Sequence, residues 1–360
     1  GLVAWWLLPG SVLDRVLPEM DAGIEMFFMS GIMMVVGAVW TVIYNADVLL
    51  SAAVRLIGRL GGLAPALKIA VAYPMQNRLR TGMALAMLSL IVFTLTVLSV
   101  IISGNASLFS DTETLTGGYH VQADTGYANP IHDIRAALRE VDGLSPNDFE
   151  AIGSFTSGNV DLKQEGSEKD PVDWWIRGLD ADYTDTTTYK FAMMAEGYES
   201  PGEIWRALQD EPGTAVVAAG LVPERSNFNV GDSGPDFSLE GFFREDDALP
   251  EVYIQTRDAS TGIEERLRVI GVFKETAFFS SSVMTSQDTL NKVLGQTVPA
   301  RSFIFRLKEP GSADAVAKAL ESHFMEYGMQ ATNLAEEIRK IASTNRVLNT
   351  LLQGFMGLGL

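Results

Sequence analysis

Residues 78–110 read RLRTGMALAMLSLIVFTLTVLSVIISGNASLFS, in which two arginines precede 30 uncharged residues that run from Thr81 to Ser110. A helix rises about 1.5 Å per residue, so roughly 20 apolar residues are enough to cross the hydrocarbon core of a bilayer. The stretch is longer than that and is rich in Leu, Ile, Val and Met. The sequence therefore predicts a membrane-spanning helix at about residues 82–103.

Three further stretches lack charge, and each of them predicts a membrane segment. Residues 26–46 are 21 uncharged residues and are expected to form a second full span. Residues 1–13 and 347–360 are also uncharged, and we expect them to be parts of spans at the two ends of the chain. Residues 1–25 would then comprise the end of one span and a short outside loop. Together these stretches indicate a piece of a longer, multi-pass membrane protein.

The charges beside the spans predict the orientation of the chain in the membrane. Residues 47–81 hold five basic side chains against one acidic side chain: Arg55, Arg59, Lys68, Arg78 and Arg80 against Asp47. Short loops rich in Lys and Arg stay in the cytoplasm. We therefore expect residues 47–81 to form a cytoplasmic amphipathic linker, with a helix at residues 49–60 along the membrane interface. Residues 104–346 are then extracytoplasmic, and the chain lies in the plasma membrane.

The acidic residues gather in the block that follows the second full span. The chain has a formal net charge of -18, and residues 104–360 alone hold 40 acidic and 21 basic side chains. A change in composition this sharp indicates a domain boundary near residue 104. An acidic block repels polyanions, which excludes a nucleic-acid partner and argues against binding of anionic lipid by the block as a whole. The absence of Cys excludes disulfides, thiol nucleophiles and Cys-ligated metal sites.

Strand-like and helix-like hydrophobic patterns follow one another in residues 104–346, which predicts a mixed α/β (α+β) domain on helical stalks. Alternation predicts strands at residues 119–123, 172–177, 214–219, 251–257, 265–274 and 303–307. Residues 149–162 are expected to form two strands with a turn near Gly158-Asn159. Helices are predicted after Asn129-Pro130, at residues 286–294, after a cap at Ser312, and from a cap at Asn333 onward.

The order of these elements predicts two subdomains. We expect the early and the late strand–helix units to pair in one subdomain, at about residues 104–190 and 300–346. Residues 190–300 are richer in turns and would be inserted as a second, β-rich subdomain. A helical stripe of Leu334, Ile338, Ile341 and Leu348 runs into the last apolar segment, so one unbroken helix is expected there.

Motifs of common active sites are absent from the sequence. It has no P-loop and no G-x-S-x-G motif, which argues against ATP hydrolysis or serine catalysis by this chain. His120, His132 and His323 lack the i, i+4 spacing of a helical zinc pair. The group Asp180, Asp182 and Asp185 resembles part of a calcium loop without its Gly and its closing Glu. We expect no catalytic residue, metal or cofactor, although the many carboxylates leave a two-acid glycosidase site open.

Three groups of residues are candidates for contacts with a partner: Asn77, Arg78 and Arg80; Trp174 and Trp175; and Phe278 and Phe279. The first group begins the span at 82–103 and is either a membrane anchor or part of a docking surface for a cytoplasmic partner. The two tryptophans point to opposite faces of one predicted strand, so one ring packs in the core and the other is exposed. The two phenylalanines precede three serines and indicate a mobile apolar loop.

Four features in order resemble one protein family. Residues 77–82 read NRLRTG and lead directly into a span, and a single large outside domain follows. Val230-Gly231-Asp232 and then LRVIGVF at residues 267–273 are similar to a pair of motifs of that domain, and residues 349–360 resemble a second core span. The layout is similar to the FtsX-like permease family of ABC transporters with its MacB-type extracytoplasmic domain. The resemblance covers about residues 66–360, and the additional span at 26–46 is typical of the second half of a duplicated permease.

The resemblance implies a permease subunit and not an enzyme. A separate cytoplasmic ABC ATPase would bind the inner face, and its closure would move the spans and the outside domain. In the family such movement drives lipoprotein or lipid release, efflux of peptides or drugs, or mechanotransmission to an extracytoplasmic partner. Membrane lipid is a further expected contact. Two alternatives stay open, a membrane-anchored extracytoplasmic sensor or binding protein and a membrane-anchored enzyme.

Overall fold

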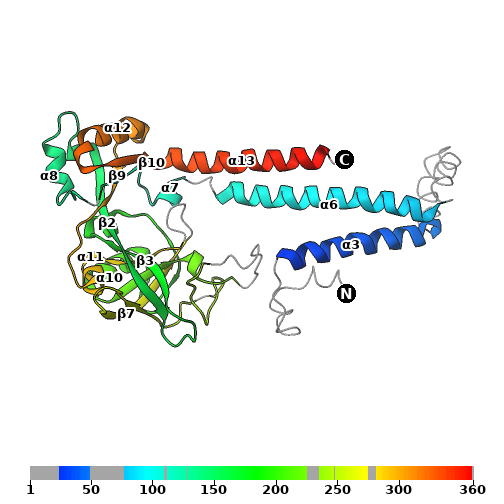
Figure 1. Ribbon diagram of the computed structural model, residues 1–360, viewed down its shortest axis with the longest axis horizontal. Helices are drawn as coiled ribbons and strands as arrows, with labels where there is room; N and C mark the ends of the chain where they lie inside the picture. Colours follow the sequence, from blue (N-terminus) through cyan, green and yellow to red (C-terminus); the bar gives the residue numbers. More distant parts are fainter. Residues whose placement is uncertain are drawn as a thin grey trace. The chain divides into compact units, whose positions relative to one another are not determined.

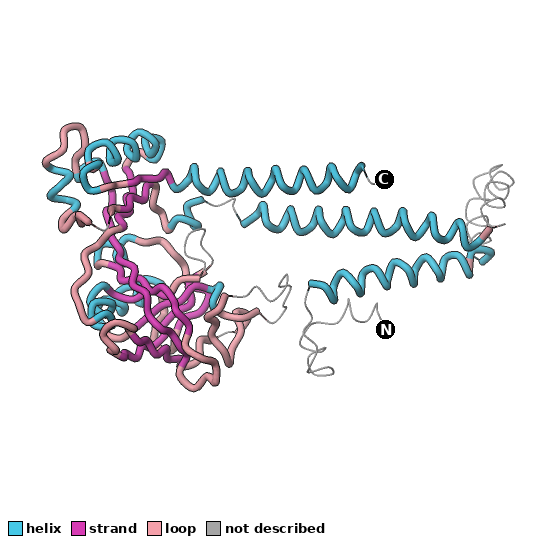
Figure 2. Tube along the Cα trace, viewed as in Figure 1, coloured by secondary structure: helices cyan, strands magenta, loops and turns pink. Residues whose placement is uncertain are grey.

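The computed structural model describes residues 24–48, 77–108, 112–126, 128–224, 235–246, 248–274 and 281–358 (Figure 1). The contacts within the chain divide it into two compact units, which are described separately. The helical unit comprises residues 1–107, 226–233 and 345–360. The α/β unit comprises residues 108–225 and 234–344 and holds all the described strands, drawn in magenta in Figure 2.

Helices α3 (Ile24–Tyr44) and α6 (Arg78–Leu108) pack antiparallel in the helical unit. A Cβ atom at Gly31 would collide with the ring of Phe93, and a Cβ atom at Gly82 would collide with Ile43. Each contact joins an early residue of one helix to a later residue of the other, which fixes the antiparallel direction. The two glycines therefore allow the close approach that small residues give to helix pairs in membranes.

One described helix, α6, is long and apolar enough to cross a membrane, over Leu79–Val97, and Ser30–Tyr44 of α3 is a shorter apolar segment. The hydroxyl groups of Thr41 and Thr94 donate to carbonyl oxygens four residues earlier, at 2.8 and 2.9 Å. Such bonds satisfy hydroxyls where no water is present. The two full spans predicted at 26–46 and 82–103 coincide with these helices, and their crossing of a bilayer stays a prediction. The segment predicted at residues 1–13 lies outside the described residues. The linker helix predicted at residues 49–60 lies outside the described residues.

The first part of the α/β unit is a four-stranded antiparallel sheet with two helices, here named the sheet lobe. Its elements are β1 (Val121–Asp124), α8 (Ile134–Arg139), the first half of β2 (Phe149–Gln164), β9 (Ser302–Leu307), α12 (Ala313–His323) and β10 (Gln330–Asn333). The spatial order is β10-β1-β9-β2. In chain order this is the 4-1-3-2 arrangement of a β-α-β-β-α-β motif, the ferredoxin-like fold. The early and late strand–helix units therefore pair in one sheet.

The second part is a closed ring of six strands, here named the barrel lobe, and it is inserted between β2 and β9. The ring runs β2-β3-β8-β5-β7-β6 and closes where β6 pairs with the end of β2, from Asp161↔Arg257 to Gln164↔Ile254. Its elements beside β2 are β3 (Val172–Leu179), α9 (Ala181–Thr186), β4 (Phe191–Met194), α10 (Pro201–Asp210), β5 (Thr214–Ala218), β6 (Val252–Arg257), β7 (Glu264–Phe273), β8 (Val283–Ser286) and α11 (Gln287–Leu294). Because β6 pairs with β2, the ring has no unpaired strand edge there that could pair with another chain, which protects against edge-to-edge aggregation.

Strand β2 corrects one sequence prediction. The expected turn near Gly158-Asn159 is wrong, because β2 continues through these residues, which pair with Ile176 and Trp175 of β3. A Cβ atom at position 158 would collide with Leu294 of helix α11. The glycine therefore serves close packing of a helix on a strand and not a reversal of the chain.

Helix starts are confirmed at two positions and corrected at two. Ser286 accepts a hydrogen bond from Thr289 N at 3.2 Å and caps α11, and Asn333 accepts from Ala335 N at 3.0 Å at the start of α13 (Leu334–Leu358). Helix α8 begins after Asp133 and not after Asn129-Pro130, because the Asp133 carboxylate accepts from Ala136 N at 2.9 Å. Ser312 makes no side-chain cap, since it ends a short 3-10 turn.

The remaining short helices are α7 (Thr112–Thr116) and the 3-10 turns η2 (Pro146–Asp148), η3 (Ala219–Leu221), η4 (Pro310–Ser312) and η5 (Met325–Tyr327). Helix α13 is unbroken from Leu334 to Leu358, as predicted from its apolar stripe.

Two hydrophobic cores divide the α/β unit. Phe149 and Ile152 of β2 belong to the core of the sheet lobe, whereas Phe155 and Val160 of the same strand belong to the core of the barrel lobe. Ala151 of β2 and Ile304 of β9 also belong to the core of the barrel lobe, although both lie in strands of the sheet lobe. Their neighbours Ile152, Phe303 and Phe305 belong to the other core, so successive residues of these strands contribute to different cores from opposite faces. The sequence pattern could not separate the cores, because the same strands contribute to both. The membrane and linker boundaries stay predictions.

Candidate functional site at the interlobe junction

The segment that enters the α/β unit makes a tight turn between α7 and β1. Gly117 and Gly118 both have positive φ, 65° and 82°, which side chains other than Gly rarely adopt. A Cβ atom at Gly117 would meet the ring of Tyr189, and one at Gly118 would meet the guanidinium of Arg306. A side chain at either position is therefore disfavoured for two reasons: the backbone has a positive φ, and the neighbouring group leaves no space for a Cβ atom.

Arg306 of β9 connects three parts of the unit at this turn. Its Nε donates to the carbonyl oxygen of Gly118 at 2.7 Å, and its Nη2 donates to Gly117 O at 3.2 Å and to Thr186 O at 2.7 Å. Gly117 and Gly118 belong to the incoming segment, Arg306 to the sheet lobe, and Thr186 to the end of α9 in the barrel lobe. A guanidinium presents several donors in a fixed plane, which suits a clamp on several carbonyls.

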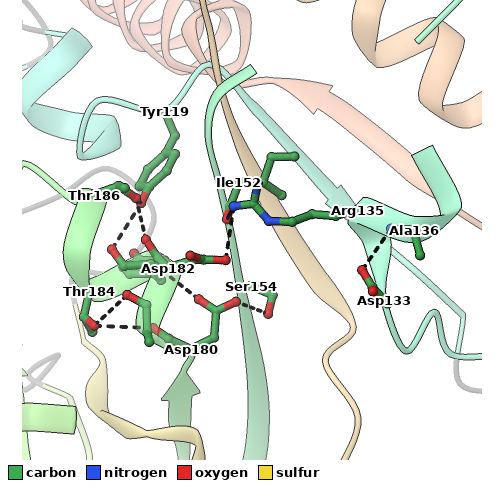
Figure 3. A network of polar contacts seen from close by, with 12 residues as sticks. Tyr119, Asp133, Arg135, Ala136, Ile152, Ser154, Asp180, Asp182, Thr184 and Thr186 are labelled. Carbon is green, nitrogen blue, oxygen red and sulfur yellow. Dashed lines mark hydrogen bonds and ion pairs between the residues drawn. The ribbon is translucent and has the colours of Figure 1, made fainter. Parts of the chain in front are cut away.

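Tyr119 lies beneath this clamp and makes a second link to the barrel lobe. Its hydroxyl oxygen lies 2.7 Å from Thr186 Oγ1 and donates to Tyr183 O at 3.2 Å (Figure 3). Its ring packs 5.6 Å from the ring of Tyr183, and the Arg306 guanidinium lies 5.3 Å from its centroid. Burial raises the pKa of Tyr119 well above its usual value, so the group stays a neutral hydrogen-bonding phenol.

The carboxylate of Asp180 links helix α9 to strand β2. It is the N-cap of α9, accepting from Tyr183 N at 2.7 Å, and its second oxygen accepts from Ser154 Oγ at 2.6 Å (Figure 3). Burial raises the pKa of Asp180, and these hydrogen bonds oppose the rise because they favour the carboxylate. The carboxyl group thus holds the barrel-lobe helix against the strand that both lobes share.

Arg135 of α8 adds a peripheral link between the lobes. Its Nη2 donates to Ile152 O at 3.1 Å and pairs with Asp182 Oδ2 at 3.1 Å. The side chains are 40% and 58% exposed, so the ion pair is solvated and contributes at most about 1 kcal/mol.

His120 connects the incoming segment to the outgoing helix. Its backbone N–H donates to Phe305 O at 2.8 Å, and its carbonyl oxygen accepts from Leu334 N, the first residue of α13, at 2.9 Å. Its Nδ1 accepts from the backbone N–H of Leu307 at 2.9 Å. Burial and the nearby Arg306 charge lower the pKa of His120, whereas Glu113 and Glu150 act in the opposite direction. The segment that enters the α/β unit and the helix that leaves it are therefore joined by hydrogen bonds of His120.

The residues predicted for partner contacts lie apart from this junction. Asn77 precedes α6 and accepts from Thr81 N at 3.0 Å, Arg78 begins the helix, and Asn77 and Arg80 are exposed. Trp174 is half-buried, and its Nε1 donates to Ser281 O at 3.2 Å. Trp175 on the opposite face of β3 is 53% exposed, which agrees with the predicted division of the pair.

Phe278 and Phe279 lie outside the described residues, as does the Val230-Gly231-Asp232 motif. The second motif of that pair, residues 267–273, lies within strand β7.

The carboxylates that resemble part of a calcium loop have other roles. Asp180 caps a helix and Asp182 pairs with Arg135, as described above. Across the part of the chain that the structure describes, no cluster of three His, Asp or Glu side chains could hold a metal ion.

No motif in the sequence marks Tyr119 or Arg306 as site residues, and Asp180 stands out only in the partial calcium-loop pattern. The pair Gly117-Gly118 is the local signal that could have pointed to a constrained turn at this place. The partners of Arg306 lie 120, 188 and 189 residues away in sequence, so no spacing pattern connects them.

These observations define a class of protein. A long apolar helix precedes a two-lobed α/β domain, whose last strand leads into another long helix. The sequence model of the MacB-like periplasmic core domain matches residues 81–323, which is more than half of the chain. The chain belongs to this family of ABC transporter permeases and is accordingly a membrane protein. The family is one of transporters and not a class of enzymes.

Solved structures resemble the chain at low sequence identity. One is the extracellular domain of the noncanonic ABC-type transporter YknZ from Gram-positive bacteria, 11% identical, with a TM-score of 0.35 over 60% of this chain and 99% of that one. Another is the periplasmic region of MacB from Actinobacillus actinomycetemcomitans, 12% identical, with a TM-score of 0.37 over 64% and 96%. No curated protein sequence matches the chain.

Proposed function

We propose that this chain is the permease subunit of an ABC transporter whose ATPase is a separate cytoplasmic chain. In this proposal, hydrolysis moves the membrane helices, and the interlobe junction passes the movement to both lobes of the α/β unit. The observation that carries it is the Arg306 clamp on Gly117, Gly118 and Thr186. Because one side chain holds the incoming segment and both lobes, a displacement of that segment is shared between the lobes.

The proposed membrane arrangement follows the charge pattern. Residues 26–46 and 82–103 would cross the bilayer, and 347–360 would begin another span. Residues 47–81, with their excess of basic side chains, would face the cytoplasm. Residues 104–346 would lie outside the cytoplasm, where the acidic composition keeps them soluble.

Two exposed groups are the proposed partner contacts. Asn77, directly before α6, and Arg80, in its first turn, are exposed and are available to a cytoplasmic ATPase. Trp175 presents a large apolar ring on the outside of the barrel lobe, which suits an extracytoplasmic lipoprotein or peptide. Lipoprotein or lipid release, efflux and mechanotransmission are each compatible with this arrangement.

The test is reconstitution with the ABC ATPase that is encoded nearest to this chain in the genome. The complex is purified in lipid nanodiscs, and ATP turnover is compared for the wild type, a deletion of the α/β unit, and Arg306→Gln. The matched control is Arg257→Gln, since Arg257 is an exposed arginine in a long ion pair of 4.0 Å with the exposed Glu264. We expect turnover to change on deletion, Arg306→Gln to shift toward the deletion value, and Arg257→Gln to stay at the wild-type value.

Each outcome bears on a different part of the proposal. Failure to form a complex, or turnover that ignores the α/β unit, would overturn the permease function. A complex in which Arg306→Gln behaves as the wild type would overturn the role of the junction.

A further inference from the structure

We propose that His120 is a proton-sensitive latch of the interlobe junction: its neutral imidazole holds the end of β9 against the start of β1, and protonation releases it. The inference adds regulation to the junction and rests on the proposed function only for its consequence in transport. The observation that supports it is the position of His120, which ends the incoming segment and makes hydrogen bonds to β9 and to the first residue of the outgoing helix α13.

The hydrogen bond at Nδ1 exists in one protonation state only. The backbone N–H of Leu307 donates to Nδ1 at 2.9 Å, so Nδ1 must carry a lone pair and the ring proton must be on Nε2. In the imidazolium form both ring nitrogens carry protons, and Nδ1–H would face the N–H of Leu307. Two donors cannot bond to each other, so protonation breaks this contact instead of weakening it by degrees.

The groups around His120 set the direction of the switch. Arg306 faces it from β9, Glu113 from α7 and Glu150 from β2. Burial and Arg306 disfavour the cation, and the two glutamates favour it; the net effect lowers the pKa of His120 below its usual 6.5. The latch is therefore closed at neutral pH and opens on the acidic side of that value.

Opening acts at the place where the two chain ends of the α/β unit meet. Leu307 is the last residue of β9 and directly follows Arg306, which clamps Gly117, Gly118 and Thr186. The backbone of His120 also accepts from Leu334 at the start of α13. Release of Leu307 thus loosens the strand end that positions the clamp, next to the first residue of α13.

The test is hydrogen exchange of the full chain in nanodiscs at pH 7.5 and pH 5, read by mass spectrometry on peptides that contain Leu307. The variant His120→Asn keeps an amide oxygen near the position of Nδ1 but cannot be protonated in this range. The control is His132→Asn, since His132 is exposed and precedes α8. Wild type and variants are compared at the same pH, which cancels the intrinsic effect of pH on exchange.

We expect similar exchange of the wild type and His120→Asn at pH 7.5. At pH 5 the wild type and His132→Asn should exchange at Leu307 roughly fivefold faster than His120→Asn, the factor that corresponds to one ordinary hydrogen bond. Equal exchange of wild type and His120→Asn at both values of pH would overturn the proposal.

A second measurement covers the case in which His120→Asn does not fold. The chain has three histidines, so long-range ¹H–¹⁵N spectra of wild-type protein with ¹⁵N-labelled histidine contain few signals. The His120 signals are those that are missing from the spectrum of His120→Gln, or they are identified by selective broadening. A neutral Nε2–H tautomer that titrates below pH 6.5 supports the latch, and an Nδ1–H tautomer contradicts it. Neither measurement involves the ATPase. The proposal about His120 can therefore be overturned while the proposed permease function stands, and the permease function can be overturned while the proposal about His120 stands.

Discussion

Gly118 and Arg306 depend on each other, because the guanidinium of Arg306 occupies the space that a side chain at position 118 would need. We expect Gly118→Ala to lower the free energy of unfolding by about 2–4 kcal/mol, combining the cost of positive φ with displacement of the clamp. Gly143 is the matched control, since its φ of 86° is close to the 82° of Gly118 and nothing lies where its Cβ would be.

Gly143→Ala should therefore show the backbone cost alone, about 1–2 kcal/mol. The measurement is chemical unfolding of the detergent-solubilised chain, followed by tryptophan fluorescence. Equal losses for the two variants would mean that the Arg306 clamp does not hold the turn.

Asp180 gives a prediction about pH. Because burial raises its pKa in the folded state, the folded state binds its proton more tightly than the unfolded state does. Ionisation of Asp180 therefore lowers the free energy of unfolding as the pH rises from the pKa of the unfolded state to the raised pKa of the folded state. Asp180→Asn keeps an acceptor for Tyr183 N and cannot ionise.

We expect the stability of Asp180→Asn relative to the wild type to increase from pH 4 to pH 7, with most of the increase on the acidic side. Thermal unfolding of both proteins across this range measures the difference, in which the other carboxylates cancel. A difference that does not change with pH contradicts the assignment of a raised pKa to Asp180.

Among the elements, β2 contributes to both lobes of the α/β unit. Strand β2 belongs to both cores, so its 16 residues hold the lobes together along one backbone. Its ends are predictable from alternating hydrophobicity, but its continuity is not, because Gly158 reads as a turn signal in sequence and becomes a packing site only when α11 lies on it.

Helix α13 is anchored in the α/β unit by its first turns. Leu334 and Ile338 are 4% and 1% exposed. We expect Ile338→Ala to cost about 2–4 kcal/mol, since it leaves a cavity in the core, whereas Ile341→Ala, at a half-buried position, should cost less. Unfolding curves of the two variants test the difference, and a larger loss for Ile341→Ala would mean that the root of the helix packs through its other face.

At the scale of the whole molecule, the orientation in the membrane can be tested because the chain has no Cys. Asp142→Cys lies in an exposed turn of the sheet lobe, and Lys68→Cys lies in the basic linker. In intact cells or spheroplasts a membrane-impermeant maleimide should label position 142, and position 68 only after permeabilisation. The unmodified chain is the control for background, and the opposite labelling pattern would reverse the proposed orientation.

Local composition was sufficient for several conclusions about this protein: the apolar helices, the acidic block after residue 104, the strand–helix order and the likeness to a permease family. These depend on hydrophobicity, charge and short-range periodicity, which act over a few residues. The closed barrel, the contribution of β2 to both cores and the junction around Arg306 required the folded chain. They arise from contacts between residues up to 189 positions apart, and such contacts leave no periodic trace in the sequence because each partner is chosen by packing geometry and not by its neighbours along the chain.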